Sequence, residues 1–201
     1  MGVLSYLRLC RAMHGRMRFF CSLVPFWVTH CVNPRRTAMP DLQFRWTRLS
    51  ELTAAQWHTV LAARQAVFVV EQNCPYQDAD ALDLHSWHLL GEVERHLAAY
   101  LRVVDPGRKS VHPGVYYAEP SIGRVLTTKA FRGLGFGRQL MHEGIVGCER
   151  RFPGQGIRIS AQSYLLKFYC ELGFQVVGEE YLEDDIPHFE MLRTDSVSRR
   201  D

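Results

Sequence analysis

The chain has 201 residues, 47% of them apolar by type, and a formal net charge of +3. This length predicts one domain with a substantial core, and no apolar run reaches the ~18 residues of a membrane-spanning helix. The charge is unevenly placed, because six arginines and no acidic residue precede Met39. The remainder carries 18 basic and 21 acidic side chains. A mildly acidic domain argues against a nucleic-acid-binding surface.

Residues 1–39 are expected to form a basic arm, which is either disordered or translated from a start upstream of the native one. Arginines followed by the apolar run 19–28 imitate a signal peptide, but that run begins late and contains a proline. Met39 directly precedes the first expected strand, as a native start would. We therefore expect one folded domain at 40–194 and a polar tail at 195–201.

The first half of this domain shows strand periodicity interrupted by one helix. Alternating residues predict a strand at 43–49 and a hairpin of 87–93 and 96–104. Ser50 or Thr53 caps a helix that runs to about Ala66. The remaining expectations are a short extended exit at 68–71, a polar loop from there to 83, and a long Pro- and Gly-containing loop at 106–120.

The second half alternates strands and helices. A strand at 122–127 precedes a helix that ends near Arg151, where Pro153-Gly154 follows. Mixed strands with helices between them predict an α/β domain of three layers. The last expected units are a strand at 157–161, a helix at 163–172, and strands at 174–180 and 187–193.

The run Arg132 to Gly137 lies between that strand and that helix. A glycine-rich helix entry presents free backbone N–H groups and the positive end of the helix dipole, so it predicts a phosphate site. A P-loop would need Lys followed by Ser or Thr, and a dinucleotide fingerprint would need glycine where Arg138 stands. The pattern Arg/Gln-x-x-Gly-x-Gly/Ala, met by Arg132, Gly135 and Gly137, is typical of the pyrophosphate loop of acyl-CoA N-acyltransferases.

A second motif, Phe168-Tyr169-x-x-x-Gly173-Phe174, closes the helix at 163–172. The two motifs in this order resemble the GNAT superfamily, and the segments 66–77 and 181–188 resemble its ElaA-like branch. The resemblance covers roughly residues 42–193, with the long loop at 106–120 as its main departure. It implies a GNAT-like three-layer α/β/α domain with a mixed, partly splayed sheet, and coenzyme A in the cleft between the strands before and after the glycine loop.

The same resemblance implies acetyl-CoA as the acyl donor. No metal is expected, because the spacing of Cys10, His14, Cys21, His30 and Cys31 matches no usual zinc-ligand pattern. Val125 and Thr127 are placed by the resemblance along the pantetheine arm. The pyrophosphate would be held by Arg132, Gly133, Gly135, Phe136, Gly137 and Arg138.

The acceptor is expected to be a primary amine that attacks acetyl-CoA directly in a ternary complex. At pH 7 only about one lysine-type amine in 2,500 is neutral, a cost of roughly 4.6 kcal/mol, so a base is needed. Glu71 and His188 are the candidate bases, and ordered water is an open alternative. Tyr169 matches the family's general acid for the leaving thiolate. A covalent intermediate on Cys170 is disfavoured, because no histidine lies near it in sequence.

The sequence therefore predicts a cytoplasmic N-acetyltransferase without nucleic-acid or membrane partners. An exposed strand edge leaves a homodimer open. The alternatives are a non-catalytic acyl-CoA-binding module and an acyltransferase that uses a longer acyl-CoA. A cationic acceptor is favoured if the acidic residues of two loops meet, and the other interpretation is a pair of hydrated surface loops. Those acidic residues are Glu71, Asp78, Asp80, Asp83, Glu183, Asp184 and Asp185.

Overall fold

The computed structural model describes residues 39–112 and 114–194. The expected basic arm before Met39 and the polar tail at 195–201 lie outside these residues. Within the described ranges, no helix is both long and apolar enough to cross a bilayer.

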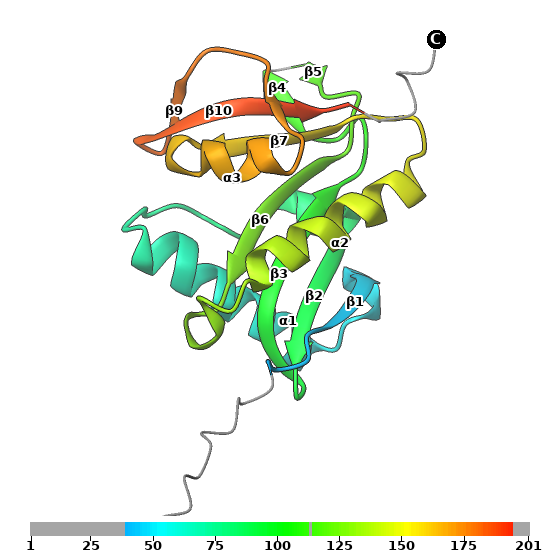
Figure 1. The fold of residues 1–201 in the computed structure, drawn as a ribbon, viewed down its shortest axis with the longest axis vertical. Helices are drawn as coiled ribbons and strands as arrows, with labels where there is room; N and C mark the ends of the chain where they lie inside the picture. The colour runs from blue at the N-terminus through cyan, green and yellow to red at the C-terminus, as the bar shows by residue number, and fades with distance from the viewer. Residues whose placement is uncertain (1–38, 113, 195–201) are drawn as a thin grey trace, which may run out of the picture. The chain divides into compact units, whose positions relative to one another are not determined.

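One mixed sheet runs through the domain in the order β1-β2-β3-β6-β7-β10-β8, and β9 pairs with β10 (Figure 1). Neighbouring strands are antiparallel except β6 and β7, which are parallel. The bounds are β1 Gln43–Arg48, β2 Trp87–Val93, β3 His96–Val104, β6 Ser121–Thr127, β7 Ile157–Gln162, β8 Gln175–Val176, β9 Tyr181–Glu183 and β10 Ile186–Arg193. A separate pair, β4 Ser110–His112 and β5 Val115–Tyr116, lies inside the long loop predicted at 106–120.

In the part of the chain that the structure describes, three α-helices accompany the sheet. They are α1 Ala54–Arg64, α2 Phe136–Arg151 and α3 Leu166–Glu171. Thr53 caps α1, because its hydroxyl oxygen accepts from the Gln56 backbone N–H while the Gln56 side-chain oxygen accepts from the Thr53 backbone N–H. The short turns are η1 Leu49–Glu51, η3 Ala81–His85, η4 Lys129–Phe131 and η5 Ser163–Leu165.

The extended exit predicted at 68–71 is wrong. Residues Gln65–Glu71 (η2) continue α1 as a π-helix. Val67 and Phe68 pack against the cluster formed by Val60 and its neighbours on the sheet, and this contact keeps the chain coiled. The strand predicted at 174–180 is also too long, because after β8 the exposed residues 177–180 lead into β9.

The sheet separates two layers of helix. Leu101 of β3 belongs to the same buried cluster as Leu140 and Met141 of α2. Tyr100, the residue before Leu101, belongs to a second cluster with Val60 of α1. Successive strand residues point to opposite faces, so α1 and α2 cover opposite faces of the sheet. The predicted three-layer α/β architecture is confirmed.

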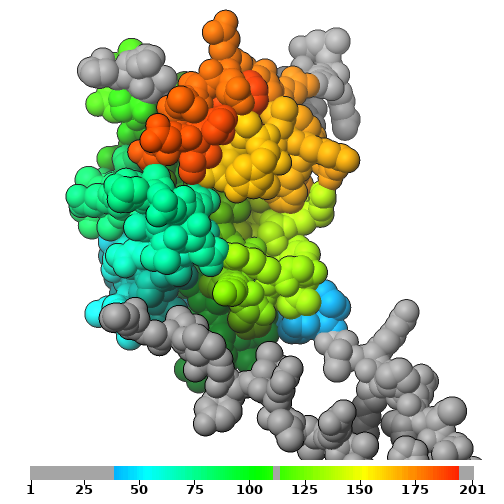
Figure 2. All heavy atoms as spheres, turned by 90° about the vertical axis from the view of Figure 1, so that its left-hand side faces the viewer, coloured from blue at the N-terminus to red at the C-terminus, as the bar shows by residue number. Residues whose placement is uncertain are grey.

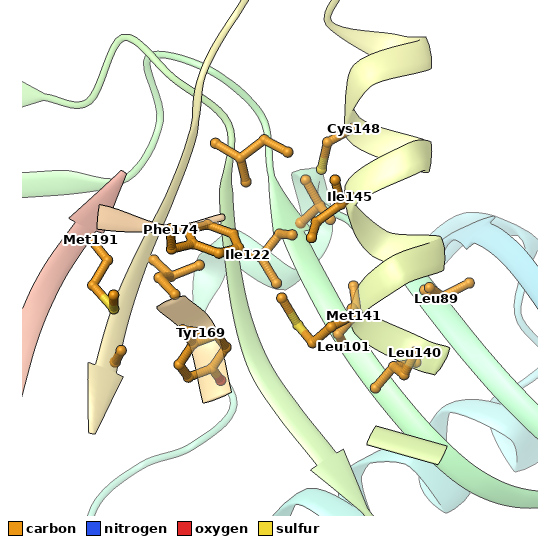
Figure 3. Close-up of a cluster of buried hydrophobic side chains, with 14 of the residues drawn as sticks. Leu89, Leu101, Ile122, Leu140, Met141, Ile145, Cys148, Tyr169, Phe174 and Met191 are labelled. Atoms are coloured by element: carbon orange, nitrogen blue, oxygen red, sulfur yellow. The ribbon is translucent and has the colours of Figure 1, made fainter. Parts of the chain in front are cut away.

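The larger cluster joins both halves of the sheet beneath α2 and α3 (Figure 3). Ile122 of β6 lies at its centre, between Ile145 of α2 and Phe174, which follows α3. Tyr169 of α3 lies at the edge of the same cluster and is 7% exposed. This core fixes α3 and its tyrosine against β6 and β7.

β6 and β7 diverge soon after they meet. Their pairing is confined to Ser121 with Arg158 and Ile122 with Ile159. In Figure 1, β7 and β10 run across the top of the view, whereas β6, β3 and β2 run down it. β6 also bulges beside β3, where its register shifts and Arg124 has a φ of 53°. The edge of β6 that faces β7 is therefore unpaired from residue 123 onward, which matches the predicted splay.

Candidate active site

A cavity of about 550 Å³ lies where β6 and β7 separate. Its wall includes β6 from Ile122 to Thr127, and it also receives Tyr169 from α3 and His188 from β10. Figure 2 shows the hollowed face, where the teal η2 region, the orange-yellow β7–α3 region and the yellow-green end of β6 adjoin. Parts of the chain far apart in sequence thus share one cavity.

The glycine run builds the turn between β6 and α2. Gly133 and Gly135 have φ values of 77° and 75°, a backbone conformation that side chains rarely adopt, and Gly135 is the N-cap of α2. A Cβ at either position would meet no atom within 4 Å. Within the described part of the chain, no backbone N–H of residues 133–137 has a protein acceptor. The turn therefore presents unused donors at the positive end of a 16-residue helix.

The two arginines of this turn are held by carboxylates. Arg132 lines the cavity, donates to the carbonyl oxygen of Thr127 at 3.1 Å and pairs with Glu71 at 2.7 Å. Arg138, in the first turn of α2, pairs with Glu171 of α3 at 2.6 Å. Both pairs are exposed, so an anion bound at the turn can compete for either guanidinium.

Tyr169 brings a protonated hydroxyl to the cavity. Its ring is packed edge-on against Phe174, and in Figure 3 its hydroxyl points away from the core, toward the space between β7 and β6. Burial, with a smaller contribution from Tyr164, raises the pKa of Tyr169 to about 12. In the described ranges this hydroxyl has no hydrogen-bond partner, so at pH 7 it is a free proton donor.

A backbone contact sets the tautomer of the neutral His188 ring. Its Nδ1 lies 2.7 Å from the carbonyl oxygen of Ile186, which can only accept, so Nδ1 carries the proton of the neutral ring. Nε2 then has a free lone pair, and no described group donates to it. The ring is 8% exposed and stacks on Tyr181. His188 is thus oriented as a proton acceptor inside the cavity.

Glu71, the other candidate base, is not part of the cavity wall. It is the last residue of η2, and its carboxylate is engaged by Arg132. Its carboxylate lies beside Arg132 of the glycine turn, and its assignment as a base stays a prediction.

The predicted acidic face is largely a buried ion-pair network. Asp78 and Asp83 are 4% and 3% exposed, and Arg64 bonds to both at 2.7 Å. Arg102 bonds to Asp80 and Asp83, and Arg124 bonds to Asp78. These aspartates are neutralised within the protein, which corrects the expectation that they face the acceptor. Of the predicted acids, Glu183 and Asp184 line the cavity.

The cavity also contains polar residues that sequence analysis did not single out, among them Tyr76, Lys109, Arg124 and Ser160. Ser160 alternates with the buried Ile159 and Ala161, so its outward direction was readable from the strand period. Lys109 belongs to the long loop at 106–120, whose path the sequence left undefined. Tyr76 and Arg124 both bond to Asp78, and the Arg124 guanidinium also lies over the Tyr76 ring, 5.4 Å from its centre.

Known proteins resemble this chain in sequence and in fold. A family model described as an acetyltransferase (GNAT) domain matches residues 108–194. A UPF0039 protein of Synechocystis sp. is 42% identical over 76% of this chain and 95% of its own length. Protein ElaA of Escherichia coli is 42% identical over 72% of this chain and 91% of its own length.

Solved structures agree. An acyl-CoA N-acyltransferase from Pseudomonas aeruginosa superposes with a TM-score of 0.69 and 41% identity, covering 77% of this chain and all of that one. The Escherichia coli ElaA structure gives a TM-score of 0.68 and 37% identity, covering 76% and 99%. The chain belongs to the GNAT acyltransferases, in the branch that contains ElaA.

Proposed function

We propose that this protein transfers an acetyl group from acetyl-CoA to a primary amine, by direct attack within a ternary complex. The observation that carries the proposal is that one cavity, beside the glycine turn, is lined by both Tyr169 and His188. Phosphate binding, leaving-group stabilisation and proton removal can then act on one bound thioester. Since coenzyme A thioesters are cytosolic metabolites, we also propose a cytoplasmic location.

The donor would lie along β6. The free N–H groups of residues 133–137 suit the pyrophosphate, with Arg132 and Arg138 adding charge. The unpaired edge of β6 beyond Gly123 offers backbone groups to the amides of the pantetheine arm, beside Val125 and Thr127. The thioester would then reach the region between Tyr169 and His188.

Tyr169 would act on the leaving thiolate. Complete proton transfer from a phenol with a pKa of about 12 to a thiolate whose ordinary pKa is about 8.5 is uphill by on the order of 5 kcal/mol. We therefore assign Tyr169 a hydrogen bond to the developing thiolate, which strengthens as negative charge forms on sulfur. His188 Nε2 would receive the proton that the attacking nitrogen loses.

The acceptor would be a cationic amine. Glu183 and Asp184 place two carboxylates on the cavity wall, and they favour a positively charged ligand. In the sequence, seven acidic residues were the basis for expecting a cationic acceptor. The structure leaves fewer of them for this role, because Asp78, Asp80 and Asp83 are paired with arginine.

Thiol release from acetyl-CoA, measured against a panel of amines, peptides and amino sugars, tests the proposal. Tyr169→Phe should lower kcat about a hundredfold, within the range of general acid–base and oxyanion contributions, and leave acetyl-CoA affinity within about twofold. Tyr116→Phe, a matched change on an exposed residue of β5, should leave both unchanged. Tight binding of acetyl-CoA without thiol release in any panel member would favour a non-catalytic binding module instead.

A further inference from the structure

A chain of four oxygen-bearing side chains leads from the cavity into its wall. Glu183 Oε2 lies 2.9 Å from Ser160 Oγ, which lies 2.5 Å from the Tyr181 hydroxyl. The Tyr181 hydroxyl lies 3.2 Å from Glu190 Oε1. Glu183 and Ser160 line the cavity, and Glu190 is partly buried behind them. The order Glu183–Ser160–Tyr181–Glu190 gives three contacts between oxygens.

The protons of this chain can be counted. Each oxygen–oxygen contact needs one proton, whereas ionised carboxylates carry none and the two hydroxyls supply one each. With both glutamates ionised, Ser160 donates to Glu183, and the single Tyr181 proton faces two acceptors, Ser160 at 2.5 Å and Glu190 at 3.2 Å. One of these two contacts is therefore left without a proton. The chain is one proton short of a complete set of hydrogen bonds.

One added proton removes the shortage. If Glu183 becomes protonated, it donates to Ser160, Ser160 donates to Tyr181, and Tyr181 donates to Glu190. All three contacts are then satisfied, and the negative charge lies on Glu190. Protonation of Glu183, at the cavity end, is thus stabilised by a complete set of hydrogen bonds that reaches Glu190, at the other end.

We propose that this chain removes the first proton from the acceptor ammonium before it attacks, with Glu183 as the catalytic base. One N–H bond of the ammonium breaks, one O–H bond forms on Glu183, and nitrogen keeps the electron pair that attacks the thioester carbonyl. His188 remains the acceptor for the second proton, lost after attack. The inference rests on the proposed amine acetylation and adds the step that makes a cationic amine reactive.

The charged groups around the chain fit this role. Arg158 Nη1 lies 4.0 Å from Glu190 Oε2, and Lys109 interacts electrostatically with both Glu190 and Glu183. Arg158 is also paired with Glu119, at 2.9 Å, so its charge is divided between Glu119 and Glu190, and Lys109 adds positive charge near Glu190 and Glu183. The other titratable groups that face the chain are Tyr117, beside Glu190, the His188 ring on Tyr181, and the neighbouring Asp184 and Asp185.

The test is a series of primary amines of graded pKa, assayed at pH 7 with saturating acetyl-CoA. Tyr181→Phe removes the central hydroxyl and keeps the ring, and Ser160→Ala interrupts the chain at its next member. Both variants should lose about tenfold or more in kcat/KM with an amine of pKa near 10, and less than about twofold with an amine of pKa near 7, which arrives largely neutral. The loss with the basic amine should shrink as pH rises.

Tyr116→Phe is the control, and acetyl-CoA affinity with thermal unfolding reports the integrity of each variant. A loss of equal size for every amine and every pH, or no loss at all, would overturn the chain as a proton acceptor. Continued transfer to the weakly basic amine by wild type and variants would leave the proposed function standing. Absence of transfer to any amine by the wild type would remove the function itself.

Discussion

Gly135 combines two requirements at one residue. Its positive φ of 75° lets the chain turn from the loop into α2, and the missing Cβ leaves open the space that we assign to the pyrophosphate. A glycine with only the first requirement occurs elsewhere: Gly154, after α2 ends, also has a φ of 75°, and a Cβ added there would meet no atom within 4 Å. Comparing the same substitution at Gly135 and at Gly154 therefore distinguishes an effect on ligand binding from an effect of backbone strain.

We predict that Gly135→Glu raises the acetyl-CoA dissociation constant by at least about tenfold, because it adds bulk and negative charge where phosphate should bind. Gly154→Glu imposes a similar backbone cost, on the order of 1 kcal/mol, at a site remote from the turn. Isothermal titration calorimetry should therefore find wild-type affinity in Gly154→Glu. Equal affinities for both variants would argue against the turn as the phosphate site.

At the scale of the element, α2 depends on two further glycines. A Cβ at Gly147 would lie 2.1 Å from the Trp46 ring, and a Cβ at Gly144 would lie 2.7 Å from a terminal methyl of Leu101. Trp46 has little freedom to move, because its Nε1 donates to Glu143 and Arg151 stacks on its face at 4.1 Å. The helix thus approaches β1 more closely than any side chain would permit.

Gly147→Ala should destabilise the protein by about 1–3 kcal/mol, although alanine is the better helix former by about 1 kcal/mol. Gly144→Ala should stay within about 1 kcal/mol of wild type, since the Leu101 methyl can rotate away. Denaturant unfolding followed by circular dichroism measures both. A Gly147→Ala protein as stable as wild type would show that the Trp46 ring moves aside at little cost.

Elements set by local chemistry were predictable from sequence. The β2–β3 hairpin was placed correctly at both ends, because Glu94 and Arg95 form a two-residue turn between clear alternating runs, and both have positive φ. The glycine turn and α2 were equally readable. Residues 65–71 were not, because Ala66 to Val70 carry the β-branched pattern of a strand, and only packing on the sheet keeps them helical.

The site itself was partly predictable. Tyr169 and His188 were identified from motifs and lie in the cavity as expected. Glu71 was one of two candidate bases and lies outside the cavity wall, whereas Asp78 and Asp83 are paired with the buried Arg64. These positions depend on which loops meet, and long-range ion pairs decide that. The sequence alone does not distinguish a carboxylate that faces a ligand from one that is paired with a buried arginine.

At the scale of the whole molecule, the ion-pair network encloses a neutral histidine. His88 Nε2 donates to the carbonyl oxygen of Asp83 at 3.0 Å, so its Nδ1 accepts from the Tyr100 hydroxyl at 2.7 Å. The ring is fully buried, and burial is the main cause that lowers the pKa of His88 to about 4. The folded protein therefore binds a proton at this ring far less readily than the unfolded chain.

The free energy of unfolding should fall as pH drops from about 6.5 to about 4, by roughly 3 kcal/mol in total from His88. In this window the unfolded chain protonates the ring and the folded protein does not, and below it the contribution is constant. Asp83 acts at lower pH: burial alone would raise its pKa, but the bonds from Arg64 and Arg102 lower it.

Urea unfolding at a series of pH values measures this slope. His88→Gln should reduce the change in the free energy of unfolding between pH 6.5 and 4. His58→Gln, at an exposed position of α1, should show the same change as the wild type. An unchanged slope in His88→Gln would assign the acid sensitivity to other groups.

The divergence of β6 from β7 also has a steady-state kinetic consequence. The glycine turn opens α2 on one face of the sheet, while Ser160 and His188 project from the other, opposite to the direction of Ile159 and Met191. If acetyl-CoA is the donor and an amine the acceptor, as we propose, the two substrates can enter by separate routes, and neither has to leave before the other arrives. Initial-rate lines for the two substrates should intersect in double-reciprocal plots, and free coenzyme A should compete with acetyl-CoA but not with the amine.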